Sequence, residues 1–255
     1  MDSQLLFSII APAYRNKMYQ DVYDSLSKNN NLSFEMIFVG HRPPEKKMPE
    51  NFKYIFTTVK PSQCLEIAAR KANGKFIMMF PDDCIASGNL PYVINSYISK
   101  LDMNKYCIVP SWSWRGRIRT NNIIFLDAIL KYPVGTCCIL KKIWNDVGGM
   151  DRRFFGILCF ADFYFRLIKM NINTYILRNC HVTEIDPLYD KDFAGKINKG
   201  TRYTNSSIGK TDNELLKNLW TYDGVSSHYR NSLVEPFSDD NILEVSQGPN
   251  MIIPR

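Results

Sequence analysis

The chain has 255 residues, of which 45% are hydrophobic and 13% aromatic, which is enough apolar material for one large α/β domain with a sizeable core. No apolar run approaches the roughly 18 residues that span a bilayer, and the first residues lack the basic region of a signal peptide, so we expect a cytoplasmic protein without a transmembrane segment. The net charge of +7 suits an anionic partner, but no zinc-finger, RNA-recognition or helix-turn-helix signature accompanies it, so we do not expect nucleic acid.

The seven cysteines indicate the same compartment. They lie mostly within apolar segments and show no Cys-x-x-Cys spacing, which favours reduced, buried thiols over disulfides or a zinc site. They are Cys64, Cys84, Cys107, Cys137, Cys138, Cys159 and Cys180.

The first hundred residues alternate between apolar strand patterns and helical spacing. We expect strands over residues 5–10, 34–39, 52–57 and 76–80, and helices over residues 18–26, 62–72 and 89–100. Ser62 is expected to cap the second helix, and Asn73-Gly74 to end it. Alternation of this kind is typical of a parallel sheet with crossover helices, so we predict an α/β fold.

The pattern becomes less regular after residue 100. Strands are expected over residues 107–110, 137–140 and 174–177, and helices over residues 141–147, 162–170 and 213–219. A loop at 111–117 and a break at Gly148-Gly149 interrupt them. We predict one domain over residues 1–189 and a polar extension over 190–255, which is not an independent domain and could fold back as a lid.

Two adjacent carboxylates, Asp82 and Asp83, follow the fourth predicted strand directly. Ligands of open α/β sheets bind at the carboxyl ends of the strands, and neighbouring carboxylates repel each other unless a cation lies beside them. Oxygen ligands suit Mg²⁺ or Mn²⁺, which also bind diphosphate oxygens. The alternative is that an acid caps the helix at 89–100. We interpret the pair as a site for a divalent metal and a phosphorylated ligand.

Three further positions are candidates for chemistry. His181 follows the last predicted strand, and a neutral imidazole is a good ligand for Mn²⁺, although a single histidine beside a strand is more often an ordinary packed residue. Asp162 precedes an apolar helix and either caps it or acts as a general base in a cleft. Asp151 follows the double-glycine break and either caps or orients that loop.

The segment after the 107–110 strand interleaves aromatic and basic residues. It contains Trp112, Trp114, Arg115, Arg117 and Arg119. Such side chains suit stacking on a base or sugar ring, or a clamp on phosphate. The alternative is that the tryptophans pack beneath a loop whose arginines are simply solvated.

In this order the motifs resemble nucleotide-sugar glycosyltransferases of the GT-A fold, closest in pattern to the large inverting family 2. Residues 6–15 look like the family's opening strand and its Pro-x-Tyr-Asn nucleotide loop, and residues 68–77 look like its approach to the metal strand. Pro81-Asp82-Asp83 stands where the family carries its Asp-x-Asp element. Residues 135–151 are similar to the segment that ends in Gly-Gly-Phe-Asp-Glu, and residues 161–167 to the acceptor-side Glu-Asp helix.

The resemblance implies a single Rossmann-like GT-A domain with a central, mostly parallel sheet flanked by helices, followed by the polar C-terminal extension. It implies Asp162 as the catalytic base, and Asp83 and His181 as ligands of Mn²⁺ or Mg²⁺. The nucleotide-sugar-binding positions would be Ala11, Pro12, Ala13, Tyr14, Arg15, Gln63, Asp82, Gly135 and Thr136. Contacts to the acceptor or the diphosphate would come from Trp112, Trp114, Arg115, Arg117, Gly149 and Asp151.

The chain departs from the family pattern in three places. Val39-Gly40-His41 replaces the acidic site after the second strand, so the nucleotide must be recognised differently there. Pro81 replaces the first acid of Asp-x-Asp. Ala161 replaces the Glu of Glu-Asp, so Asp162 matches either acid of that helix.

We predict a metal-dependent glycosyltransferase that moves a sugar from a nucleoside-diphosphate sugar to a hydroxyl of a glycan or lipid-linked acceptor. UDP or GDP is the family expectation for the donor. One base and one metal suffice for a single displacement with inversion, whereas a retaining double displacement would want a nucleophile that we cannot place. Two alternatives stay open: a catalytically degenerate GT-A-like module that binds a nucleotide or glycan, and a nucleotidyltransferase. Peripheral association with a membrane also stays open, although no amphipathic anchor is obvious.

Overall fold

The computed structural model describes residues 5–28, 31–114, 117–118, 135–156, 158–185, 206–222 and 228–230. Its strands are β1 (Phe7–Pro12), β2 (Phe34–Gly40), β3 (Phe52–Phe56), β4 (Phe76–Met79), β5 (Cys84–Ser87), β6 (Tyr106–Trp114), β7 (Arg117–Ile118), β8 (Cys137–Leu140), β9 (Asn173–Glu184), β10 (Trp220–Tyr222) and β11 (His228–Arg230). Its helices are η1 (Asn16–Met18), α1 (Tyr19–Ser27), α2 (Pro61–Lys71), α3 (Leu90–Ile98), α5 (Lys141–Asp146), α6 (Leu158–Lys169) and α7 (Ser206–Leu219).

The main sheet has the strand order β3-β2-β1-β4-β8-β6-β9-β5, with β7 paired to β6. The first four strands in the chain are parallel, as predicted, because β1 pairs with β2 and β4, and β2 pairs with β3. Every residue of β2 and β4 is buried, as expected for parallel strands covered on both faces. Parallel strands end at one edge of a sheet, so the residues that follow β1, β2 and β4 lie together there.

The second half of the sheet is mixed. β8 runs antiparallel to both β4 and β6, β6 and β9 are parallel, and β5 is antiparallel to β9. The predicted α/β sheet is therefore confirmed, with its parallel part concentrated in the first four strands.

Two strands are longer than their apolar runs predicted. β6 continues through residues 111–114, which we predicted as a loop, because this segment pairs with residues 181–184 of β9. A shift in register between Pro110 and Ser111 separates the two halves of this pairing. β9 continues past residue 177 to Glu184, so His181 lies within a strand.

A strand that the sequence analysis did not predict follows the acid pair directly. This strand is β5, and the turn before it contains Asp82 and Asp83. Helix α3 is capped by Asn89, whose side-chain oxygen accepts the N–H of Tyr92. The alternative in which an acid of the pair caps this helix is therefore wrong.

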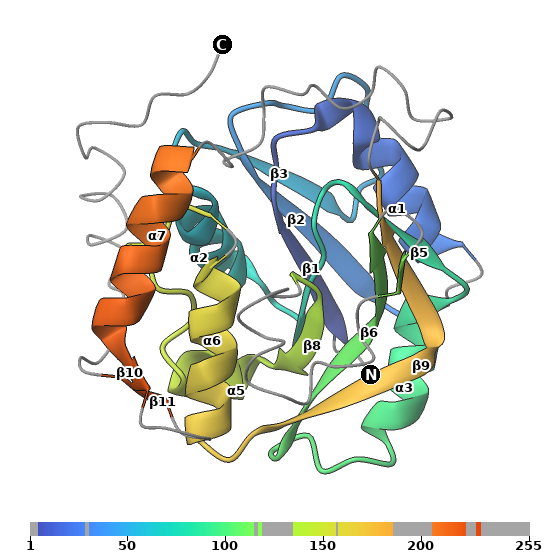
Figure 1. Cartoon of the computed structure of the whole chain (residues 1–255). Helices are drawn as coiled ribbons and strands as arrows, with labels where there is room; N and C mark the ends of the chain where they lie inside the picture. The colour runs from blue at the N-terminus through green and yellow to red at the C-terminus, as the bar shows by residue number, and fades with distance from the viewer. Residues whose placement is uncertain are drawn as a thin grey trace.

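Helices lie on both sides of the sheet (Figure 1). α1 packs near β5 and α3 near β9, while α2 packs on β1 and β2 from the opposite side. α2 begins at Pro61, with Lys60 as its N-cap residue, because proline suits the first position of a helix. Ser62 is thus not the cap that we predicted, and its hydroxyl donates instead to the carbonyl of Phe154 at 2.6 Å.

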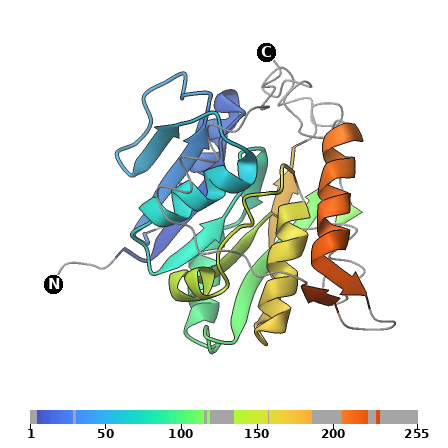
Figure 2. The same cartoon turned by 90° about the vertical axis from the view of Figure 1, so that its left-hand side faces the viewer.

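The described part of the extension is docked on the domain. α7, predicted as a shorter helix, packs beside α6 (Figure 2). The Asp212 carboxylate of α7 accepts the N–H groups of Phe155 at 2.9 Å and Gly156 at 2.7 Å. Burial raises the pKa of Asp212. The buried apolar residues of this segment are Leu216, Leu219 and Trp220.

Two sequence-level expectations concern the whole chain. All seven cysteines are buried and free, as predicted, and burial raises the pKa of Cys64 to about 12. Among the described residues, no helix has both the length and the apolar character needed to cross a membrane.

Candidate functional site

The acid pair after β4 is joined to the loop after β1 by Arg15. The guanidinium Nη1 donates to Asp82 Oδ1 at 2.5 Å, and Nη2 lies 2.9 Å from Asp83 Oδ2. Asp82 Oδ2 also accepts the backbone N–H groups of Tyr14 at 2.6 Å and Arg15 at 2.7 Å. Burial lowers the pKa of Arg15, but the charges of Asp83 and Asp82 outweigh it and raise the pKa above its ordinary value, so the guanidinium stays charged.

The predicted nucleotide loop continues from this ion pair into an aromatic corner. The Tyr14 ring lies 5.1 Å from the His41 ring, and its hydroxyl donates to the carbonyl of Val59 at 3.2 Å. Burial lowers the pKa of His41, so the ring is neutral, and its Nδ1 is buried without a hydrogen-bond partner. His41 is a residue that the sequence analysis noted only as a replaced acid; its place directly after β2 was the available signal.

Gln63 lies at the start of α2 near the same corner. Its Oε1 accepts the N–H of Lys60 at 3.2 Å, while its Nε2 is buried without a partner. A buried donor without a partner is costly, and a ligand is one way to satisfy it. The predicted positions Ala11 to Arg15 and Gln63 thus lie around one edge of the sheet.

Gly135 lies close to Pro81, the residue before the acid pair; its role in binding the nucleotide sugar stays a prediction. A Cβ built on Gly135 would lie 3.1 Å from both Pro81 and the ring of Phe160, so only glycine fits here without displacing a neighbour. Thr136 follows it and is buried, with Oγ1 lacking a hydrogen-bond partner. Two α6 side chains contact this part of the site: the Phe160 ring lies against Gly135, and the Tyr164 hydroxyl donates to the carbonyl of Thr136 at 3.4 Å.

His181 does not lie beside Asp83. In the β5–β9 pairing Ser87 is opposite His181, whereas Cys84, the residue after Asp83, is opposite Glu184. The His181 ring nitrogen Nε2 lies 2.7 Å from the Ser113 hydroxyl, and burial lowers the pKa of His181. An antiparallel strand rises by about 3.4 Å per residue, so His181, opposite Ser87, lies four residues along the strand from the position of Asp83. The structure does not assemble the predicted metal ligand pair.

The residues at the acid pair do not fit a Mg²⁺ or Mn²⁺ ion. Such an ion needs carboxylate oxygens at about 2.0–2.1 Å in near-octahedral geometry, and Arg15 already lies across both carboxylates. In the part of the chain that the structure describes, no three His, Cys, Asp or Glu side chains are grouped closely enough to hold a metal.

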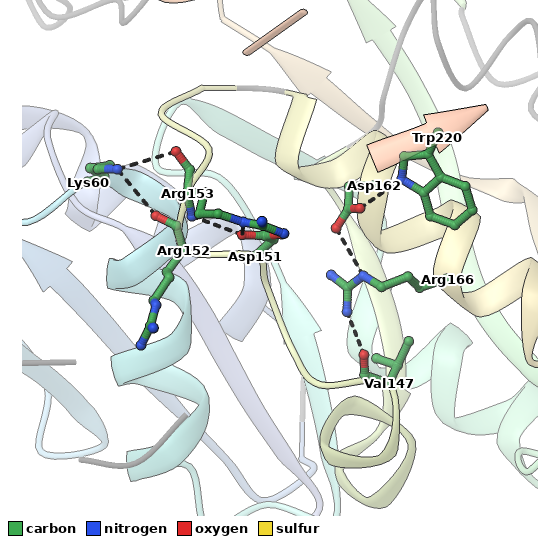
Figure 3. Close-up of polar contacts among 8 residues, drawn as sticks. All are labelled: Lys60, Val147, Asp151, Arg152, Arg153, Asp162, Arg166 and Trp220. Atoms are coloured by element: carbon green, nitrogen blue, oxygen red, sulfur yellow. Dashed lines mark hydrogen bonds and ion pairs between the residues drawn. The ribbon is translucent and has the colours of Figure 1, made fainter. Parts of the chain in front are cut away.

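Asp162 lies inside the protein, on α6, and points toward Trp220 of β10 (Figure 3). Its side chain is fully buried, Oδ2 accepts from Arg166 Nε at 2.9 Å, and Oδ1 accepts from the indole N–H of Trp220 at 2.9 Å. Arg166 Nη1 in turn donates to the carbonyl of Val147 at 2.5 Å. This conformation does not present Asp162 to an acceptor, and its role as the base stays a prediction.

The double-glycine loop is held by an ion pair and by hydrogen bonds from Lys60 (Figure 3). Asp151 is buried and accepts from Arg153, through the backbone N–H and the guanidinium Nε at 3.0 Å and through Nη2 at 2.7 Å. The Lys60 ammonium donates to the carbonyls of Arg152 and Arg153. Asp151 therefore orients its loop, as one of our two interpretations held. Gly149 lies against the Glu66 carboxylate.

The Trp–Arg segment is a strand at its start and not a loop. Trp112 is buried in β6 opposite Val182, which matches the alternative of packed tryptophans. Trp114 and Arg117 belong to β6 and β7 and pair with each other, and their side chains lie outside the described part. Arg115 and Arg119 lie outside the described residues altogether.

Comparison with known proteins gives a fold relationship. No protein-family model and no curated protein sequence matches the chain. Solved structures of Staphylococcus aureus TarS do match it. The crystal structure of TarS 1–349 is 15% identical with a TM-score of 0.56, over 69% of this chain and 60% of the TarS chain.

Two ligand complexes of TarS are similar to the chain in the same way. The complex with UDP is 15% identical with a TM-score of 0.55, over 84% of this chain and 66% of the other. The complex with UDP-GlcNAc is 13% identical with a TM-score of 0.58, over 84% and 67%. The chain thus spans about two thirds or less of the TarS chains that it matches. At these identities the comparison shows the fold, and it confirms the predicted GT-A glycosyltransferase fold.

Proposed function

We propose that this protein is a glycosyltransferase that takes its sugar from a nucleoside-diphosphate sugar, with UDP as the expected nucleotide. The observation that carries the proposal is the assembly at the carboxyl edge of the sheet, where the loop after β1 is bonded to the acid pair after β4. This is the edge at which open α/β sheets bind ligands. The TarS complexes with UDP and UDP-GlcNAc support the choice of donor.

The aromatic corner supplies the groups that would hold the nucleoside. The buried Tyr14 ring packs against the His41 ring and positions it, and the buried donor of Gln63 and the unpartnered nitrogen of His41 offer hydrogen bonds. Gly135 lets the chain pass close to Pro81, next to the acid pair at which the donor diphosphate is proposed to bind. The acceptor is proposed to be a hydroxyl of a glycan or a lipid-linked saccharide, attacked in a single inverting displacement.

A second candidate is a GT-A-like module that binds a nucleotide sugar without transferring it. One observation favours it: α6 presents Phe160 to the site, while both oxygens of Asp162 are bonded to Arg166 and Trp220. Transfer needs a group that takes the acceptor proton. If Asp162 is that base, its bond to Trp220 must open when the acceptor binds.

A thermal-shift panel followed by turnover assays separates these candidates. Nucleoside diphosphates and nucleotide sugars are tested first, and a ligand at 100 times its Kd should add about 2.7 kcal/mol of stability. Tyr14→Ala should lose this shift, whereas Lys17→Asn, an exposed change three residues away, should keep it. Stabilisation by none of the nucleotides would overturn the proposal.

The turnover assay then follows release of the nucleoside diphosphate from the stabilising donor, with glycan and lipid-linked acceptors. Release with transfer supports the enzyme, and binding without release supports the module. Asp162→Asn that transfers at a normal rate would exclude Asp162 as the base. Release of pyrophosphate from a nucleoside triphosphate would identify a nucleotidyltransferase instead.

A further inference from the structure

The position after Tyr14 carries an unusual side chain for the loop that it belongs to. The matching family loop reads Pro-x-Tyr-Asn, and this chain reads Pro12-Ala13-Tyr14-Arg15. The substitution puts a permanent positive charge at the carboxyl edge of the sheet. Only folding shows what that charge meets, because its partners lie 67 residues further along the chain.

The guanidinium of Arg15 lies across the two carboxylates that the resemblance assigns to the donor and the metal. It donates to Asp82 at 2.5 Å through Nη1 and lies 2.9 Å from Asp83 through Nη2. The charge of Glu184, on the neighbouring strand, also raises the pKa of Arg15. The local excess of negative charge that would draw in a divalent ion is therefore partly neutralised by a side chain.

Asp82 anchors this arrangement from the other side. Its Oδ2 accepts two backbone N–H groups of the loop while its Oδ1 accepts from the guanidinium. The carboxylate is almost fully buried, with 1% of the residue surface exposed. Moving Arg15 away to admit a metal would break these charge-assisted bonds, which are the strong class of hydrogen bond.

Arg15 keeps donors that the acid pair does not use. Nε is buried without a hydrogen-bond partner, and each Nη carries two hydrogens, so a guanidinium that spends one from each on the acids has others left. Guanidinium groups bind phosphate oxygens through two parallel bonds. A diphosphate beside the acid pair could therefore be bound by the same cation that neutralises the acids.

We propose that Arg15 takes the place of the divalent metal, so that this protein binds the diphosphate of its donor without a metal ion. The inference rests on the proposed function, because it concerns the same donor site. The resemblance implied that a metal ion binds the diphosphate; under this inference the guanidinium of Arg15 provides the positive charge instead.

The test compares UDP and GDP binding by isothermal titration to the full chain, with EDTA and with Mn²⁺. The same Kd in both conditions is expected. Arg15→Asn restores the family residue and should weaken binding in EDTA at least about tenfold, with recovery when Mn²⁺ is added. Arg15→Lys keeps the positive charge but loses the guanidinium and its paired donors. Its nucleotide affinity in EDTA should therefore lie between that of Arg15→Asn and that of the unmodified chain. Lys17→Asn removes one exposed charge nearby and should bind as the unmodified chain does.

A second measurement needs no variant. Electron paramagnetic resonance of titrated Mn²⁺ should show the same free-ion signal with the unmodified protein as without it, both in the absence of UDP and at a matched UDP concentration, where UDP itself binds part of the Mn²⁺. UDP binding that requires Mn²⁺, or Mn²⁺ bound by the unmodified chain at this site, would overturn the inference and leave the proposed function standing. Binding of neither nucleotide in either condition would overturn the proposed function as well.

Discussion

Glu66 of α2 is a carboxylate inside the protein. It takes part in none of the ion pairs found among the described residues. Its Oε1 accepts the backbone N–H of Met150, next to Gly149 of the double-glycine loop. Burial raises the pKa of Glu66 to about 7 from its ordinary value of 4.5, although the Met150 bond and the charge of Arg166 oppose this. A single side chain therefore makes the stability of this loop depend on pH.

The sign of that dependence follows from proton binding. Between pH 4.5 and about 7 the folded protein keeps a proton on Glu66 that the unfolded chain releases, so stability falls as the pH rises through this window. A shift of this size corresponds to about 3 kcal/mol. Glutamine does not titrate, so the free energy of unfolding of Glu66→Gln should rise relative to that of the unmodified chain as the pH increases through this window.

Urea unfolding at several pH values between about 5 and 8 measures this difference. Glu50→Gln, at an exposed glutamate, should run parallel to the unmodified chain. A constant gap between the Glu66→Gln and unmodified curves would show that Glu66 is not the group responsible.

At the scale of elements, the ends of β1 and β2 are packed directly on each other. The N–H of Ala13 donates to the carbonyl of Val39 at 2.8 Å, and the next residue, Gly40, lies so close to the Ala13 carbonyl that a Cβ would overlap it. The overlapping atom belongs to the backbone, so no side-chain rotation relieves it. The loop after β1 can therefore take this position only because Gly40, in the neighbouring strand, has no side chain.

Gly40→Ala should push this loop away from β2 and move Tyr14 and Arg15 with it. We expect weaker nucleotide binding together with a loss of about 1–3 kcal/mol of stability. Gly88→Ala is the matched control, because Gly88 has a φ of 72° but open space around its Cβ position. It should cost roughly 1–2 kcal/mol through backbone strain alone and leave binding intact.

Titration with UDP and urea unfolding of both variants provide the comparison. Equal nucleotide affinity in Gly40→Ala and the unmodified chain would show that the loop does not need this close approach.

At the scale of the whole molecule, the described extension is joined to the domain through a buried polar centre. Trp220 packs edge-on against Phe165 with ring centroids 5.1 Å apart, and its indole N–H donates to Asp162. Asp162 in turn holds Arg166, which reaches the carbonyl of Val147. One carboxylate thus connects α6, β10 and the loop after α5, and this role holds whether or not Asp162 also acts in transfer.

Asp162→Asn should destabilise the protein by about 3–5 kcal/mol, because it leaves the buried charge of Arg166 without its partner. Asparagine retains an oxygen for Trp220, so the loss comes mainly from the ion pair. The exposed pair of Lys142 and Asp146, also four residues apart, provides the control, and Asp146→Asn should cost no more than about 1 kcal/mol.

Thermal and urea unfolding of the two variants tests this, and the unfolding data must accompany any activity assay of Asp162→Asn. Similar losses of stability in the two variants would mean that the buried ion pair stabilises the protein no more than a surface pair does. The structural role that we assign to Asp162 would then be wrong.

The amino-acid sequence by itself determined the first half of the fold and the place of the site. The apolar runs of β1, β2 and β4 have the length and composition of buried parallel strands, and the acids after β4 mark a strand end by local order alone. Helix α2 was predicted within one residue of each end, because its boundaries are set by Pro61 and by Asn73-Gly74.

Only the tertiary structure decided which side chains meet. β5, the second halves of β6 and β9, and the orientation of His181 depend on pairing between segments far apart in the chain, which no local pattern encodes. Arg15 meets Asp82 across 67 residues of chain, and Asp162 meets Trp220 across 58. Sequence shows that a charge is present, but burial and pairing in the folded chain decide whether it is a ligand, a counter-ion or part of the scaffold.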